Sequence, residues 1–210
     1  MLVLCLLGFV GGAPRLAGAI LVEIKDGKGQ PVADAVASLT PLDRTPVIKV
    51  PDEPAVIVQD NEEFSPVVTV VVVGGKVLIP NRDKVQHHVY SLSPAKRFDI
   101  PLYKGEMKEP VVFDRPGVVA LGCNIHDWMA AYVVVLATPH FAKSAAAGNA
   151  QIGDLPPGRY RLEVWHQRIT APVVREVTVN SDPSTQVISV TLRELRQIRR
   201  APETGGGAYR

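Results

Sequence analysis

The sequence contains little cysteine, few aromatic residues and almost no net charge. Its 210 residues include two cysteines and 6% aromatic residues, and the formal net charge is only +2. A charge this small argues against nucleic acid or a membrane surface as the main partner, because binding to either needs a concentrated basic surface. The shortage of aromatic residues, beside many valines, prolines and glycines, favours sheets and turns. We therefore predict an all-β protein.

Recognisable catalytic motifs are missing as well. The sequence has no glycine-rich phosphate loop, no His-Glu-x-x-His zinc helix, and no Ser/His/Asp set in a familiar local context. We therefore do not expect an enzyme. His140 and His166 stand outside any ligand pattern, and we expect them to be surface histidines or histidines satisfied by their neighbours.

A long apolar run is also lacking. Residues 2–10 are apolar, far short of the roughly 20 residues that a membrane-spanning helix needs. The pattern Ala17-Gly18-Ala19 fits cleavage by signal peptidase after Ala19. We predict that residues 1–19 are a signal peptide and that the protein is periplasmic. The apolar run lacks a preceding Lys or Arg, and a retained N-terminal anchor is the alternative.

Removal of the leader takes Cys5 away and leaves Cys123 as the only thiol of an exported protein. A lone thiol in an oxidising compartment is a liability unless something occupies it. His126 and Met129 follow Cys123 within seven residues, and a thiolate, imidazoles and a weak thioether suit an electron-transfer copper site. An inert buried cysteine and a methionine that only fills the core are the alternatives.

Such a site needs a second histidine, and the chain offers His87 or His88. Successive side chains of a strand point to opposite faces, so only one of the two can face inward. Residues alone leave the choice between them open.

Residues 55–137 resemble the plastocyanin and azurin family of blue copper proteins, the cupredoxins. The resemblance is carried by Phe64, Pro66, Val70, Gly75, Val77, Asn81, Asp83, His87, Cys123, His126 and Met129. It extends to plastocyanin-like bacterial proteins that are often named methylamine utilization proteins. It implies a Greek-key sandwich and one mononuclear type 1 copper ion bound by His87, Cys123, His126 and Met129. It also implies that His88 stands where relatives have an asparagine that ties the ligand loops together.

One departure from the family concerns the axial ligand. Only two residues separate His126 from Met129, fewer than plastocyanin and azurin use. Binuclear copper domains share this spacing, but they need two cysteines in the loop, and this loop has one. A binuclear centre is excluded on ligand count.

The flanking segments resemble a second family, the small carboxypeptidase regulatory-like sandwiches of Ig-like or prealbumin-like type. The resemblance is carried by residues 22–39 and by residues 148–165, which include Leu155-Pro156-Pro157-Gly158-Arg159-Tyr160. We predict that the cupredoxin domain is inserted in, or joined to, this sandwich. The expected units are the leader at 1–19, first sandwich strands at 20–48, the cupredoxin domain at 49–139, the remaining strands at 140–192 and a basic, disordered tail at 193–210.

Strands are expected where apolar runs or alternation meet turn residues. The expected ranges are 20–24, 35–39, 67–73, 76–79, 88–92, 118–121, 131–136, 173–179 and 187–192.

The sequence thus predicts an exported copper protein that carries single electrons between redox partner proteins. One alternative is a periplasmic protein that captures or delivers copper with the same ligands. Another is a structural or carbohydrate-binding sandwich without a metal.

Overall fold

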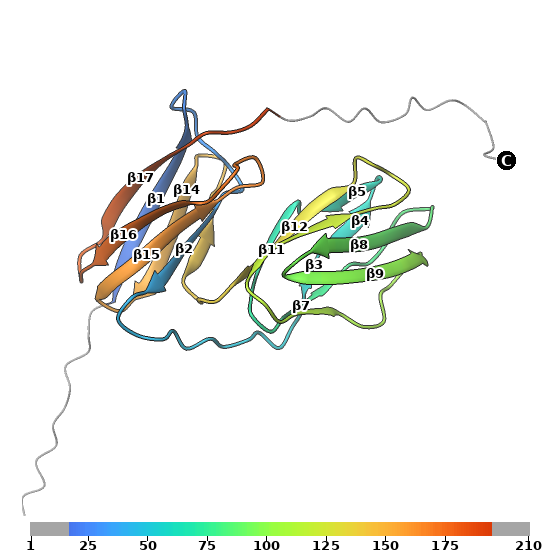
Figure 1. Cartoon of the computed structure of the whole chain (residues 1–210), viewed down its shortest axis with the longest axis horizontal. Helices are drawn as coiled ribbons and strands as arrows, with labels where there is room; N and C mark the ends of the chain where they lie inside the picture. The colour runs from blue at the N-terminus through green and yellow to red at the C-terminus, as the bar shows by residue number, and fades with distance from the viewer. Residues whose placement is uncertain (1–16, 195–210) are drawn as a thin grey trace, which may run out of the picture.

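Residues 17–194 are described by a computed structural model, and in this range the chain forms strands and no helix. Figure 1 shows two β-sandwiches side by side. The terminal sandwich is built from both ends of the described chain, and the central sandwich is built from the residues between them.

The terminal sandwich consists of two sheets, with strand orders β14-β1-β17 and β13-β2-β15-β16. Its strands are β1 (Gly18–Asp26), β2 (Val36–Pro41), β13 (Phe141–Lys143), β14 (Asn149–Leu155), β15 (Gly158–Trp165), β16 (Val173–Val179) and β17 (Ser184–Val190). The first strand pairs in parallel with the last strand, from Ile20 opposite Ser184 to Asp26 opposite Val190. The two ends of the described chain therefore close one sheet.

The central sandwich contains a five-stranded sheet, β6-β12-β11-β8-β9, a three-stranded sheet, β10-β7-β3, and the hairpin β4-β5. Its strands are β3 (Ala55–Val56), β4 (Val58–Asp60), β5 (Glu63–Ser65), β6 (Val68–Val72), β7 (Gly75–Leu78), β8 (His87–Ser93), β9 (Lys96–Tyr103), β10 (Val111–Phe113), β11 (Gly117–Gly122) and β12 (Ala130–Leu136).

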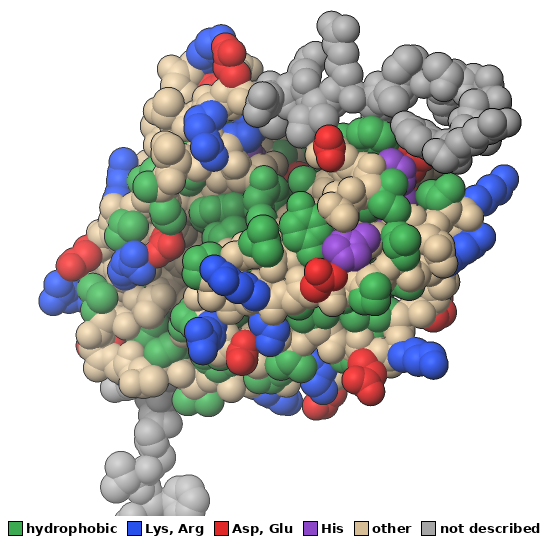
Figure 2. Space-filling view, turned by 45° about the vertical axis from the view of Figure 1, so that its right-hand side comes forward, with side chains coloured by type: hydrophobic (Ala, Val, Ile, Leu, Met, Phe, Trp, Pro, Cys, Tyr) green, Lys and Arg blue, Asp and Glu red, His purple; other side chains and the backbone are tan. Residues whose placement is uncertain are grey.

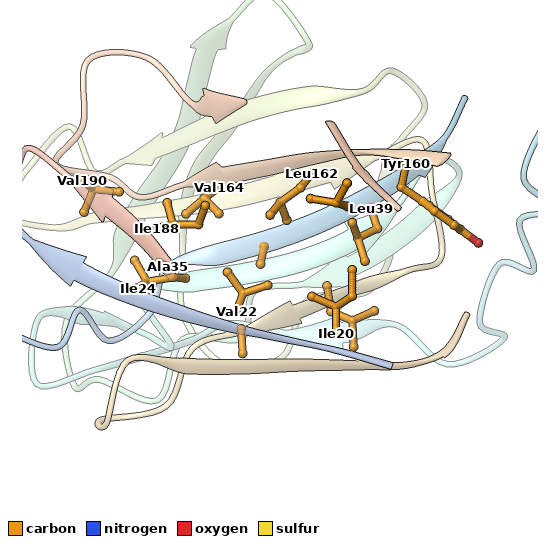
Figure 3. Packing of buried hydrophobic residues seen from close by; sticks show 14 of the residues in the cluster. Ile20, Val22, Ile24, Ala35, Leu39, Tyr160, Leu162, Val164, Ile188 and Val190 are labelled. Carbon is orange, nitrogen blue, oxygen red and sulfur yellow. The ribbon is translucent and has the colours of Figure 1, made fainter. Parts of the chain in front are cut away.

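Alternation along the strands produces a core in each sandwich. In the terminal sandwich, Ile20, Val22 and Ile24 of β1 are fully buried and point toward β2 and β15, where Leu39 and Leu162 meet them (Figure 3). The residues between them, Leu21 and Glu23, are less buried and face away from the core. Burial of such a side chain contributes about 1.5–3 kcal/mol, so this core holds the two sheets together.

The valine run of β12 serves two faces. Val133 and Val135 lie in the core of the central sandwich, while Val134 points the other way and packs with Val36 and Val68. Beside this cluster, the rings of Tyr132 and Trp165 lie 5.6 Å apart, centre to centre. The apolar run of β12 is continuous because both of its faces are buried, one in the core of the central sandwich and the other against the terminal sandwich.

Each strand expected from the sequence is present, with ends displaced by a few residues. Short strands such as β4 and β10 were not predicted, and neither was the longer β9. Pro101 interrupts the pattern of β9 and is tolerated because β9 is the edge of its sheet.

The predicted leader lies outside the described residues except for residues 17–19, and β1 begins at Gly18. The predicted tail lies outside them except for Arg193 and Glu194. Within residues 17–194, no helix has the length and apolar character needed to cross a membrane.

The terminal sandwich should lose stability in mild acid. Burial of His166, together with the charge of Arg168, lowers its pKa below the ordinary value of 6.5, and burial beside Arg44 acts in the same direction on the pKa of His140. Below the ordinary pKa of 6.5 the unfolded chain therefore binds more protons than the folded protein does. The free energy of unfolding falls as the pH falls below 6.5. Thermal unfolding from about pH 7.5 to about pH 5 should show a falling midpoint, and His166→Gln should reduce the fall. An equal fall in the variant would contradict this assignment.

Candidate metal centre

The central sandwich brings distant parts of the sequence together at one end of its five-stranded sheet. Strand β11 lies between β8 and β12, and Gly122 at its end pairs with Tyr90 of β8. His87 begins β8, and Cys123 follows β11 directly. A Cβ at position 122 would lie 3.0 Å from the Tyr90 ring, so a larger residue there would require the ring to shift.

Three of the four residues predicted as ligands form a cluster. One donor atom each from His87, Cys123 and His126 lies within 4.8 Å of the others. The Nδ1 atoms of the two histidines are 3.2 Å apart, and Cys123 Sγ lies 3.9 Å from His87 Nδ1. Bonds of about 2.0–2.3 Å from nitrogen and sulfur to an ion such as zinc place neighbouring donors about 3–4 Å apart. The spacing therefore fits a metal of this size.

Burial differs between the two histidines of the cluster. His87 is fully buried and Cys123 is 4% exposed, whereas the side chain of His126 keeps 15% of its surface exposed. Figure 2 shows histidine side chains that reach the surface among hydrophobic ones, and Ile125, next to His126, is 50% exposed. The cluster is thus closed on the His87 side and accessible at His126.

Met129 lies next to the cluster but is not shown to be a ligand. It is 2% exposed and packs in the same core as Cys123. Its backbone N–H donates to the carbonyl of His126 at 3.0 Å, which closes the ligand loop into a tight turn. Axial ligation by Met129 stays a prediction.

The ring of Trp128 packs beside that of His126, the more exposed histidine of the cluster. The two rings lie 5.0 Å apart, and the indole N–H of Trp128 donates to the carbonyl of Glu62 at 3.0 Å. The contact with His126 and Glu62 connects the ligand loop to the β4-β5 turn.

His88 does not tie the ligand loops together, and that expectation was wrong. Alternation along β8 turns His88 away from His87, and its Nε2 pairs with Asp99 Oδ1 of β9 at 2.6 Å. His140 lies edge-on to Tyr160, and His166 is buried in the terminal sandwich. None of these three histidines joins the cluster of His87, Cys123 and His126.

Asn81 organises the loop that leads to His87. Its side-chain amide donates to the carbonyls of Val85 at 3.0 Å and Tyr103 at 2.8 Å, while its Oδ1 accepts the backbone N–H of Asp83 at 2.9 Å. The residue is 2% exposed, so each lost hydrogen bond would leave a polar group without water. Asn81 thus fixes the loop at three points.

Asp83 accepts a hydrogen bond from the buried histidine, with 2.7 Å between Asp83 Oδ2 and His87 Nε2. Burial acts to raise the pKa of Asp83, but the hydrogen bonds from His87 and from the backbone of Glu62 and Asn61 together lower it below its ordinary value of 3.8. The carboxylate therefore stays ionised at neutral pH.

Tyr103 of β9 belongs to the same hydrogen-bond network, because its carbonyl accepts from the side chain of Asn81. Its hydroxyl donates to the carbonyl of Ile79 and accepts from the side chain of Gln59. Burial, opposed by the bond from Gln59 and reinforced by the charge of Cys123, raises the pKa of Tyr103 to about 12. The phenol stays protonated as a donor.

Sequence reasoning missed Glu62 and gave no role to Asp83. Asp83 stands in the Asn81-x-Asp83-x-x-x-His87 pattern, where its distance of four residues from the histidine was the available signal. Glu62 comes from a hairpin that the sequence did not predict, and nothing in its local sequence points to the site.

Comparisons with known proteins show limited similarity. No protein-family model and no curated protein matches the chain. Among solved structures, the reduced Cu(I) form of an amicyanin mutant is 23% identical, with 47% of this chain and 99% of that chain covered and a TM-score of 0.37. A purple cupredoxin from Nitrosopumilus maritimus is 26% identical, with 39% and 99% covered and a TM-score of 0.35. A copper-containing nitrite reductase from Thermus scotoductus SA-01 is 19% identical, with 46% and 25% covered and a TM-score of 0.38.

Replacing Asn81 should destabilise the protein through its ligand loop. Asn81→Ala leaves the carbonyls of Val85 and Tyr103 without their donor and the N–H of Asp83 without its acceptor, which should cost about 1–3 kcal/mol. Asn149→Ala is the control, because Asn149 is exposed and such changes stay within about 0.5 kcal/mol. Chemical denaturation measures both, and equal effects would contradict the role of Asn81.

Proposed function

We propose that this protein is an exported, mononuclear type 1 copper protein that carries single electrons between redox partner proteins. The observation that carries the proposal is the convergence of one thiol sulfur and two imidazole nitrogens, from Cys123, His87 and His126, at the end of one sheet. The resemblance of residues 55–137 to the blue copper proteins supports the same function.

The donor set distinguishes among metals. Soft sulfur with imidazole suits copper, whereas magnesium and calcium prefer oxygen ligands. The cluster as found has no carboxylate member, since Asp83 reaches His87 on the side away from Cys123. When bound, copper supplies a change of one electron between Cu(I) and Cu(II).

The chain contributes a frame that resists rearrangement. His87 and Cys123 are buried at the ends of paired strands, and the backbone bond from Met129 to His126 limits movement of the third ligand. A frame that holds the donors in place keeps small the structural change that accompanies gain or loss of an electron. This property suits electron transfer better than release of a metal.

The exposed histidine gives the route to a partner. His126 is the cluster member with the largest accessible surface, and Ile125 beside it is half exposed. We propose that redox partners dock on this face, and that the periplasm is the compartment, because the predicted leader and the single remaining thiol both fit export.

Adding Cu(II) tests the function. The wild-type protein should bind one copper ion, develop intense thiolate-to-copper absorption, and show narrow parallel hyperfine splitting in spin resonance. Reduction and reoxidation should be reversible. Cys123→Ser and His87→Gln should abolish the absorption, because each removes a donor of the cluster. His88→Gln is the matched control and should keep the absorption, because His88 faces Asp99.

Two results would overturn the proposal. Reduction of the added copper with loss of the thiol would indicate capture or delivery of copper instead. Failure to bind copper, with no effect of Cys123→Ser on any ligand, would indicate a sandwich without a metal function.

A further inference from the structure

The contact between Asp83 and His87 lies on the side of the ring away from Cys123. We propose that Asp83 is a positioning residue that holds His87 in the one tautomer able to bind copper and that it favours the Cu(II) state. This inference rests on the proposed function and assigns a role to a residue that is not itself a ligand.

The tautomer follows from the hydrogen-bonding groups. A neutral imidazole has one N–H donor and one acceptor nitrogen, and an ionised carboxylate only accepts. With Asp83 Oδ2 at 2.7 Å from Nε2, the proton of His87 belongs on Nε2. The lone pair is then on Nδ1, which faces Cys123 Sγ at 3.9 Å and His126 Nδ1 at 3.2 Å.

The carboxylate of Asp83 is itself held in place. Its Oδ1 accepts the backbone N–H of Asn61 at 2.7 Å, and its Oδ2 accepts that of Glu62 at 3.0 Å. Asn61 and Glu62 have φ angles of 53° and 57°, in the left-handed region of the backbone that residues other than glycine rarely adopt. Two successive N–H groups of a turn form a concavity that binds an anion, and here the anion is the Asp83 side chain.

The same turn reaches the other histidine. The carbonyl of Glu62 accepts the indole N–H of Trp128, whose ring lies against His126. The carboxylate of Glu62 lies 4.0 Å from His126 Nε2. The turn of residues 61–62 therefore braces the loops that carry both imidazoles, and Asp83 is its connection to His87.

Electron donation decides the effect on copper. A carboxylate that accepts the second N–H of a metal-bound histidine raises the basicity of the ligand, and loss of such a partner typically weakens metal binding about 10–100-fold. A more basic imidazole stabilises the more highly charged ion. Loss of the carboxylate should therefore weaken the binding of Cu(II) more than that of Cu(I).

Paired variants test the inference. Asp83→Asn removes the charge with little change in shape. Asp99→Asn makes the same change at the neighbouring histidine, since Asp99 pairs with His88 outside the cluster. Asp83→Asn should raise the reduction potential by about 59 mV for each tenfold loss of Cu(II) over Cu(I) affinity, while Asp99→Asn should leave it unchanged. Equal potentials in the two variants would overturn the redox part of the inference.

A measurement without copper tests the positioning part. Nitrogen-15 NMR of the metal-free wild-type protein should show His87 with its proton on Nε2. A proton on Nδ1 would overturn the inference even if Asp83→Asn fails to fold. A different outcome separates the two proposals. If the wild-type protein has the Nε2 tautomer but develops no thiolate-to-copper absorption, the proposed function and the redox part of the inference are overturned, while the positioning role of Asp83 stands.

Discussion

The site depends on the position of one strand. Strand β11 lies between β8 and β12, so its end brings Cys123 beside His87, which precedes it by 36 residues, while the short return to β12 carries His126. Shifting a strand by one residue turns every side chain to the opposite face. Such a slip at β8 would bring His88 inward in place of His87. Val89 of β8 and Val119 and Leu121 of β11 hold the register, because each is buried in the core of the central sandwich and a slip would turn it away from that core.

Hydrogen bonds from outside the sheet complete the arrangement. Asn81 fixes the loop that leads to β8 and accepts the backbone N–H of Asp83, and the carboxylate of Asp83 in turn holds the ring of His87. The β4-β5 turn connects Asp83 with Trp128 on the ligand loop. The two imidazoles therefore share one network, although 39 residues separate them. Most members are buried or partly buried, where an unpaired polar group is costly, so the network favours a single geometry of the donors.

Sequence reasoning was most successful where side-chain period decides structure. Alternation and valine runs located β1, β6, β11 and β12, and the all-β class followed. Alternation also required that only one of His87 and His88 face inward, and the family resemblance selected His87, which is the buried one. The roles of Asp83 and Glu62 were out of reach, because they depend on left-handed backbone angles in a hairpin too short to leave a periodic pattern. The expectation for His88 failed because it came from the resemblance rather than from the strand, whose outward face offers Asp99.

The proposed function depends on a thiolate and two imidazoles that share one copper ion. X-ray absorption at the copper edge, on protein loaded with one equivalent of copper, examines this most directly. We predict one short bond to sulfur and two bonds to imidazole nitrogen, with distances that change little between the oxidised and reduced forms. A spectrum without a sulfur neighbour, or one with a second copper nearby, would contradict this arrangement.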